Sequence, residues 1–388
     1  MTYITLKETL CQSPGPVENL YTASSELPES ATNRSIMTVD KLSAPTIPLG
    51  STILVTGGNG LIASHVVDQV LAHGYRVRAT VRNSSKCAWM ESLYAKRHGS
   101  GRFELIEVSD FSSPNAWDDA VKGVAGIAHV AGGVDLAVQD FEAVLKEELP
   151  LNISLLEAAQ KESSVKSFVL TSSAWAAFTP DTSKKQRLAE WSWNEDAIKL
   201  ASSNASPQEK GISNFMALKT RLEQEVWKWV NNTNPRFAFN SVLLDTVMGE
   251  VLDPLNQGIP STAGMVHWVW TGENRQILDY IQPQWHVGTQ DTGLLYVAAL
   301  TTAGVDRERL YGFGDRFSWY QVGAILKQLY PDKDIPPVKN LGTDQTDVPN
   351  QRGAELLRGL GQKGWTSVEE SVKANALSFL QLENAKEG

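Results

Sequence analysis

A strand that passes through glycines into a helix, within residues 51–65, constrains the fold of this chain more than any other stretch. Residues 52–55 are apolar and mostly β-branched, which is typical of a buried parallel strand. Gly57 and Gly60 follow, and a helical pattern begins at Leu61. Such a turn uses conformations open to glycine, brings the backbone close to phosphates and offers them the N–H groups of a helix N-terminus. We therefore expect a dinucleotide site whose turn is formed by Gly57, Gly60, Leu61 and Ile62.

Apolar runs typical of strands alternate with helical patterns beyond this turn. Strands are expected at residues 52–55, 75–81, 103–108, 124–130, 167–170 and 237–243, and a long helix at residues 141–161. Alternation of this kind implies right-handed crossovers and a doubly wound parallel sheet. The sequence therefore predicts an α/β fold with a Rossmann dinucleotide-binding core over residues 49–245.

The two ends of the chain differ from this core in composition. Residues 254–284 are rich in Gly, Pro and Trp and are expected to be irregular, and short helices are expected around residues 291–303, 319–329 and 367–380. We predict a smaller C-terminal substrate lobe over residues 246–388, with elements that return to the core. Residues 1–48 are rich in Ser, Thr, Pro and Glu, contain no continuous apolar signal segment, and are expected to form a flexible extension.

Charge and cysteine content argue against several classes of partner. The formal net charge of −9 argues against nucleic acid, and no apolar run reaches the length of a membrane span. The two cysteines, Cys11 and Cys87, cannot form a disulfide framework and lack metal-ligand spacing. We therefore expect a cytoplasmic monomer or homodimer that acts on a small molecule and has no metal site.

The end of the second expected strand indicates which dinucleotide binds. A chain that binds the ribose 2′-hydroxyl of NAD usually has Asp or Glu at this point, but no acid occurs between Asp68 and Glu91. Arg82 follows the strand, and Lys86 lies shortly after it. Two cations suit the 2′-phosphate of NADP(H), so we predict NADP(H) as the cofactor. The alternative is that both are ordinary solvated surface residues.

Several stretches carry a family resemblance: TGGNGLIASHV, VRATVRNSSK, GVAGIAHVA, SFVLTSSAW and GLGQKGWTSVEESVK. From about residue 45 to the C-terminus the chain resembles an extended short-chain dehydrogenase/reductase. Within that group it is similar to fungal and yeast aldehyde or ketone reductases and to plant dihydroflavonol and cinnamoyl-CoA reductases. The resemblance implies that Asp110 touches the adenine and that His129 and Ala131 flank the cofactor. It also implies that the Ser173 hydroxyl binds the substrate carbonyl, the alternative being a serine satisfied by nearby backbone.

The same family calls for a Tyr-x-x-x-Lys pair on the following helix. The family's lysine holds the nicotinamide ribose and lowers the pKa of the tyrosine, whose phenol gives a proton to the carbonyl oxygen as hydride arrives. Lys219 is in register in this chain, but Phe215 occupies the tyrosine position. No tyrosine lies between Tyr94 and Tyr280, so none can take its place by a shift in register.

Neighbouring positions also depart from the family pattern. Leu218 stands where the family commonly has Ser, and Leu244 and Asp245 stand where the reductases commonly have Pro and Asn. This favours natural divergence over an engineered Tyr→Phe substitution. Three functions remain open: an NADP-dependent oxidoreductase that uses Ser173, water or an acid of the substrate in place of the phenol; a redox-neutral cyclase, isomerase or dehydratase; and a non-catalytic binding module. Cofactor consumption distinguishes the first from the second.

Aromatic residues from two segments that the resemblance places over the nicotinamide indicate a hydrophobic or aromatic substrate. The pocket is expected to be lined by Trp175, Phe178, Phe215, Asp245, His267 and Trp268, with Trp191, Trp193 and Trp270 from the same segments. The alternative for each tryptophan is ordinary core packing. His267 is a candidate replacement acid, although a lone histidine is more often structural.

Overall fold

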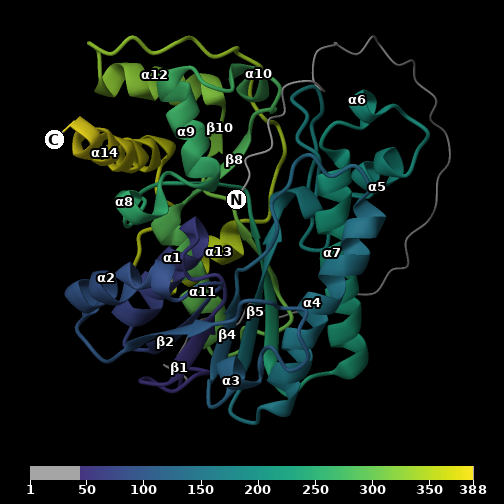
Figure 1. The fold of residues 1–388 in the computed structure, drawn as a ribbon. Helices are drawn as coiled ribbons and strands as arrows, with labels where there is room; N and C mark the ends of the chain where they lie inside the picture. The colour runs from purple at the N-terminus through teal and green to yellow at the C-terminus, as the bar shows by residue number, and fades with distance from the viewer. Residues whose placement is uncertain (1–43, 388) are drawn as a thin grey trace.

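A seven-stranded parallel sheet forms the centre of the molecule (Figure 1). The computed structural model describes residues 44–387. The strand order is β3-β2-β1-β4-β5-β6-β9, with the strands β1 (Thr52–Val55), β2 (Arg76–Val81), β3 (Phe103–Glu107), β4 (Gly126–His129), β5 (Ser167–Ser173), β6 (Ala238–Leu244) and β9 (Arg309–Gly312). The order reverses between β1 and β4, and doubly wound sheets bind ligands in the crevice at such a reversal.

Helices cover both faces of the sheet (Figure 1). One face carries α1 (Leu61–Ala72), α2 (Trp89–His98), α11 (Thr289–Thr301) and α13 (Gln351–Gly359), and the other carries α3 (Asp118–Val121), α4 (Phe141–Lys161) and α7 (Ser213–Thr233). Side chains alternate along each strand, so Ile53 and Val55 join the core beneath α1 and α11, while Leu54 joins the core beneath α4 and α7. A strand buried on both faces explains the unbroken apolar run in the sequence.

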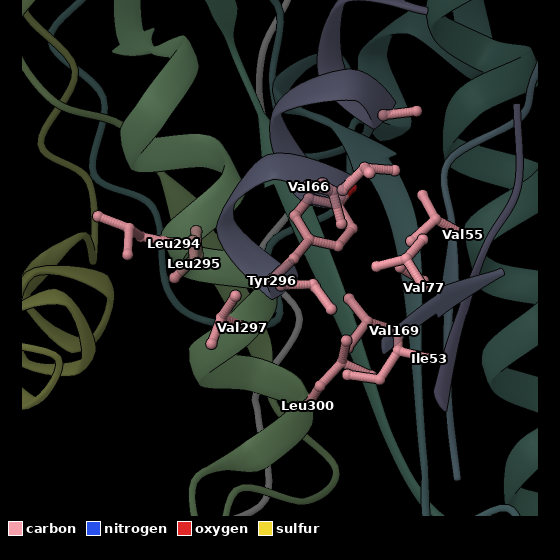
Figure 2. Close-up of a cluster of buried hydrophobic side chains, with 14 of the residues drawn as sticks. Ile53, Val55, Val66, Val77, Val169, Leu294, Leu295, Tyr296, Val297 and Leu300 are labelled. Atoms are coloured by element: carbon pink, nitrogen blue, oxygen red, sulfur yellow. The ribbon is translucent and has the colours of Figure 1, made fainter. Parts of the chain in front are cut away.

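α1 and α11 pack in close contact. A Cβ at Gly293 of α11 would lie 2.5 Å from the carbonyl oxygen of His65, so only glycine permits this approach. Figure 2 shows Tyr296 and Leu300 of α11 reaching toward Val66 of α1 and the strands of the sheet. The Tyr296 hydroxyl lies 2.5 Å from Thr171 Oγ1, which ties α11 to β5 near the edge where the strand ends.

A separate group of helices and a three-stranded sheet form the C-terminal lobe (Figure 1). Its sheet has the order β10-β8-β7, with β7 (Thr246–Met248), β8 (Gln284–Gly288) and β10 (Arg316–Phe317). Its helices are α8 (Pro254–Gln257), α9 (Ser261–Thr271), α10 (Arg275–Leu278), α12 (Trp319–Leu329) and α14 (Val368–Glu387). The lobe has an apolar core of its own, to which Trp270, Val372 and Phe379 contribute.

Shorter elements complete the described chain. They are the 3₁₀ turns η1 (Ser85–Cys87) and η2 (Ala174–Ala176) and the helices α5 (Glu195–Ala201) and α6 (Pro207–Lys210). Over residues 44–387, none of the helices combines the length and the apolar character that a membrane crossing needs.

The predicted fold class is confirmed, and all six expected strands belong to the main sheet. The expectation of an irregular region at residues 254–284 is wrong, because α8, α9 and α10 lie there. Pro260 and Gly272 bound α9 rather than break it, Gly272 in the left-handed conformation that ends helices. The strands β7 to β10 were not predicted. The division of the chain at residue 245 stays a prediction, and the predicted flexible extension falls largely on residues 1–43, which lie outside the described residues.

Candidate functional site

The glycine turn after β1 leaves a helix N-terminus open. Gly57 has a φ of 69°, and a Cβ there would lie 3.2 Å from atoms of Ala131, so both conformation and space favour glycine. Gly60 is the N-cap of α1; within the described residues no side chain caps this end, and its first turn holds no acid. The N–H groups at the start of α1, including those of Leu61 and Ile62, therefore stay available to an anion.

His129 and Ala131 lie where β1 and β4 end. Thr56 Oγ1 lies 2.9 Å from His129 Nδ1 and accepts the Ala131 N–H at 2.9 Å. His129 Nε2 lies 3.1 Å from Asn152 Oδ1. Burial lowers the pKa of His129 to about 4, so the ring is neutral at physiological pH. The bonds fix the backbone beside Gly57, and the neutral ring places no charge there.

Arg82 and Lys86 lie on the exposed surface just after β2. Neither side chain takes part in an ion pair with another described residue, so both cations are free to meet an anion. Asp110 follows β3, and its carboxylate accepts hydrogen bonds from Ser112 and Ser113 that lower its pKa. The roles of these three residues toward a cofactor stay predictions.

Ser173 is the last residue of β5, and its side chain caps the turn η2. Its Oγ accepts the backbone N–H of Trp175 at 3.2 Å. A serine hydroxyl both donates and accepts, so this bond leaves the O–H proton to be donated elsewhere. Ser173 pairs with Leu244 across the sheet, which brings the ends of β5 and β6 side by side.

Phe215 and Lys219 lie one helical turn apart on α7. Phe215 is 5% exposed, and its ring meets that of Trp175 edge-on, with 5.9 Å between the centroids. Lys219 Nζ lies 5.2 Å from the centre of the Phe215 ring and donates to the carbonyl oxygen of Gly133 at 2.9 Å. Burial lowers the pKa of Lys219, and the negative charge of Glu148 opposes this in part. The structure therefore brings Phe215, Lys219 and Trp175 together.

A buried ion pair holds α7 against the sheet. Arg309 Nε and Nη2 donate to the two carboxylate oxygens of Glu223 at 2.9 and 3.0 Å, and Ser172 of β5 donates to Glu223 at 2.7 Å. Burial would raise the pKa of Glu223, but the Arg309 charge and these hydrogen bonds outweigh it and hold the pKa below its usual value. Trp193 lies 3.9 Å and Trp191 5.8 Å from the guanidinium, measured to the ring centroids. Both tryptophans therefore flank this ion pair, and over residues 44–387 neither makes a ring contact with Phe215.

Asp245 follows β6 at the end of a hydrogen-bonded chain that starts beside Phe215. Trp175 Nε1 donates to Gln284 Oε1 at 2.9 Å, and Gln284 Nε2 donates to Thr246 Oγ1 at 3.0 Å. The Thr246 N–H then donates to Asp245 Oδ1 at 2.7 Å. Burial raises the pKa of Asp245 to about 8. These hydrogen bonds link the ends of β5 and β6 through Thr246, the first residue of β7.

Of the other expected pocket residues, Phe178 lies in a cluster against which Trp175 also packs, whereas His267 and Trp268 have different neighbours. Phe178 belongs to a cluster with Phe313, at 6.3 Å between ring centroids. His267 and Trp268 lie on α9, where His267 Nε2 is 3.6 Å from Glu383 of α14. Among the described residues, the contacts of His267 and Trp268 lie within the lobe, and the structure does not join them to Phe215.

Two residues that contact the site are missing from the sequence-based expectations. The Gly133 carbonyl oxygen accepts a hydrogen bond from the Lys219 ammonium. The sequence signal for this residue is the Gly132–Gly133 pair after β4, since glycines allow another group to come close to the backbone. Gln284 links Trp175 to Thr246, but no motif surrounds it. Its position depends on how β8 pairs with β7, which the local sequence does not specify.

Known proteins are similar to this chain in sequence and in architecture. The profile of the NAD dependent epimerase/dehydratase family matches residues 53–192. "Aldehyde reductase 2" of Sporidiobolus salmonicolor is 36% identical over 86% of this chain and 97% of its own, and "NAD-dependent epimerase/dehydratase terH" of Aspergillus terreus is 35% identical over 85% and 97%. The crystal structure of Gre2 from Candida albicans in complex with NADPH has the same fold at 20% identity, with a TM-score of 0.73 over 86% of this chain and 99% of that one. This chain therefore belongs to the NAD dependent epimerase/dehydratase family, the extended short-chain dehydrogenase/reductases, and is an enzyme of that oxidoreductase family.

Proposed function

We propose that this enzyme is an NADP(H)-dependent reductase of a hydrophobic or aromatic small-molecule carbonyl compound. The observation that carries this proposal is the set of residues at the carboxyl edge of the sheet. This edge holds an open glycine turn, Ser173 at the end of β5 and Lys219 on α7. The tyrosine that the reductase pattern calls for is replaced by Phe215. The names of relatives, an aldehyde reductase and a "Ketoreductase adrE" from Penicillium roqueforti, support the same class of reaction.

The residues around the crevice fit a nicotinamide dinucleotide. The turn at Gly57, whose positive φ and contact with Ala131 favour glycine, and the open start of α1 suit a pyrophosphate. Arg82 and Lys86 would neutralise a 2′-phosphate, and Lys219 would hold the nicotinamide ribose through its ammonium. When bound, the cofactor supplies the hydride.

The surroundings of Phe215 support an apolar substrate. Phe215 lies in a buried cluster with Val138, Phe141 and Leu218, and the partly buried Trp175 packs against it. Such walls with few polar groups are typical of sites for hydrophobic small molecules. The Ser173 hydroxyl would donate a hydrogen bond to the carbonyl oxygen and so orient the carbonyl group.

A redox-neutral reaction on the same scaffold is the second candidate. The observation that favours it is Phe215 itself, which has no proton to give and is packed against Trp175 rather than left loose. Loss of a positioned general acid typically costs about 10²–10⁴-fold in rate, so a reductase with this substitution needs another acid. A cyclase, isomerase or dehydratase carries out no net reduction, so it does not depend on a phenol that protonates a carbonyl oxygen as hydride arrives.

Mass spectrometry of products separates the two candidates. The purified protein is incubated with NADPH and a panel of aromatic and aliphatic aldehydes and ketones, with NADP⁺ in place of NADPH as the control. Reduction gives products with two added hydrogens and matching loss of absorbance at 340 nm. Products of unchanged mass, or products that have lost water, formed equally with NADP⁺, would refute the reductase and favour the redox-neutral reaction.

A further inference from the structure

Asp245 lies at the edge of the sheet where the substrate carbonyl would bind. Its predecessor Leu244 pairs directly with Ser173 in the parallel register of β6 and β5. The bonds through Gln284 and Thr246 join Asp245 to Trp175, whose ring packs on Phe215. The strand register therefore places Asp245 next to the Ser173–Leu244 pair, and the hydrogen-bonded relay connects it to the tryptophan that packs on Phe215.

The carboxyl of Asp245 accepts hydrogen bonds but forms no ion pair with a cation of residues 44–387. Oδ1 accepts from the Thr246 N–H at 2.7 Å and from Thr246 Oγ1 at 3.3 Å, and Oδ2 accepts from the Trp285 N–H at 3.2 Å. A carboxyl group has further lone-pair sites on each oxygen, so these bonds leave room for a proton on Oδ2. The residue keeps part of its surface accessible.

Charges around Asp245 favour its neutral form. Burial raises its pKa to about 8, and the nearby carboxylate of Asp344 adds to the effect. Trp285 connects the two carboxyl groups: its Nε1 donates a hydrogen bond to Asp344, and its backbone N–H donates one to Asp245. Arg316 stacks on Trp285, 4.5 Å from its ring centroid, and Lys219 is engaged with Gly133. Neither of these cations forms an ion pair with Asp245 in the described part of the chain.

We propose that Asp245 is the acid that takes the place of the missing phenol and gives its proton to the substrate carbonyl oxygen. This inference rests on the proposed reductase function. The carbonyl carbon accepts hydride from the reduced nicotinamide dinucleotide, which becomes oxidised, and the C=O double bond becomes a C–O single bond. The carbonyl oxygen takes the Asp245 proton, the carboxyl becomes a carboxylate, and a proton from solvent restores it.

The test begins with Asp245→Asn, which keeps the size and the hydrogen-bond acceptor of the side chain but has no acidic proton. We expect kcat for carbonyl reduction to fall about 10²–10⁴-fold with little change in KM for NADPH. The wild-type rate should decline above about pH 8, where Asp245 ionises, and this decline should disappear in the variant. The matched control is Asp344→Asn, which should keep its rate at pH 7. Its loss of activity on the alkaline side should begin at a lower pH than in wild type, because removing a like charge near Asp245 lowers the pKa of that carboxyl.

Phe215→Tyr in the Asp245→Asn background tests whether a tyrosine phenol at position 215 and the Asp245 carboxyl have the same role as proton donor. A phenol beside Lys219 should restore about 10²-fold of the lost rate, whereas in the wild-type background the gain should be much smaller because an acid is already present. Equal gains in both backgrounds, or an Asp245→Asn variant as active as wild type, would overturn the inference while leaving the reductase function intact. Absence of reduction in wild type and in Phe215→Tyr would overturn the reductase function and this inference together.

A stability measurement tests the protonated carboxyl without any turnover. The folded pKa of about 8 lies above the ordinary value of 3.8, so the folded protein binds the extra proton and its stability falls as pH rises through that interval. Asp245→Asn does not titrate there. The melting temperature of Asp245→Asn relative to wild type should therefore rise between pH 4 and pH 8. A constant difference across this range would contradict a protonated Asp245.

Discussion

Glu223→Gln should destabilise the enzyme strongly, because it leaves the Arg309 guanidinium buried without a counter-charge. The two side chains are 2% and 0% exposed, and Nε–Oε1 is 2.9 Å. Breaking a buried pair by removing one partner typically costs about 3–5 kcal/mol. Unfolding entropy of about 2.1 cal/mol/K per residue gives about 0.8 kcal/mol/K for a chain of 388 residues, so the melting temperature should fall by about 4–6 °C.

The assay is thermal unfolding followed by circular dichroism, with Glu225→Gln as the matched control on the same helix. Glu225 pairs with Lys228 at 3.0 Å on the surface, and loss of such a pair typically costs less than about 1 kcal/mol. Because Glu223 also accepts from Ser172 of β5, the variant should in addition weaken NADPH binding through movement of α7. A melting temperature of Glu223→Gln within 1 °C of that of Glu225→Gln would refute the reasoning.

Two further predictions concern the cofactor and the N-terminal segment. Arg82→Ala should reduce the preference for NADPH over NADH by roughly tenfold, since a charge-assisted bond to the 2′-phosphate is lost; fluorescence titration measures this, with Arg76→Ala at the other end of β2 as control. An unchanged preference would show that Arg82 is ordinary surface. Deletion of residues 1–36 should leave the melting temperature and NADPH affinity unchanged, because the segment lacks periodic apolar residues; a drop of several degrees would contradict this.

The parts of the fold that could be predicted are those that residues close together in the sequence specify on their own. The strand at residues 52–55 and the glycines after it specify a buried strand and a turn, and the alternation that follows specifies the doubly wound sheet. β9 (Arg309–Gly312) was missed because a short strand with an arginine has no apolar run. Its arginine is buried only because Glu223, far away in the sequence, neutralises it.

The candidate site shows the same division between local and long-range information. Register on α7 identified Phe215 and Lys219, and both lie on one face of that helix beside Trp175. The setting of Asp245 depends on β8 and on Asp344, which are brought to it by folding. A raised pKa of this kind arises from burial and from neighbours distant in sequence, so the residue type alone does not reveal it.

Transfer of deuterium from NADPH labelled at C4 of the nicotinamide tests the central claim most directly. The wild-type enzyme is incubated with the labelled cofactor and the best carbonyl substrate of the panel, and the product is analysed by mass spectrometry. We predict an alcohol with one deuterium on the former carbonyl carbon, formed in equal amount to NADP⁺. A substrate converted without deuterium and without cofactor oxidation would contradict the claim that this enzyme is a reductase.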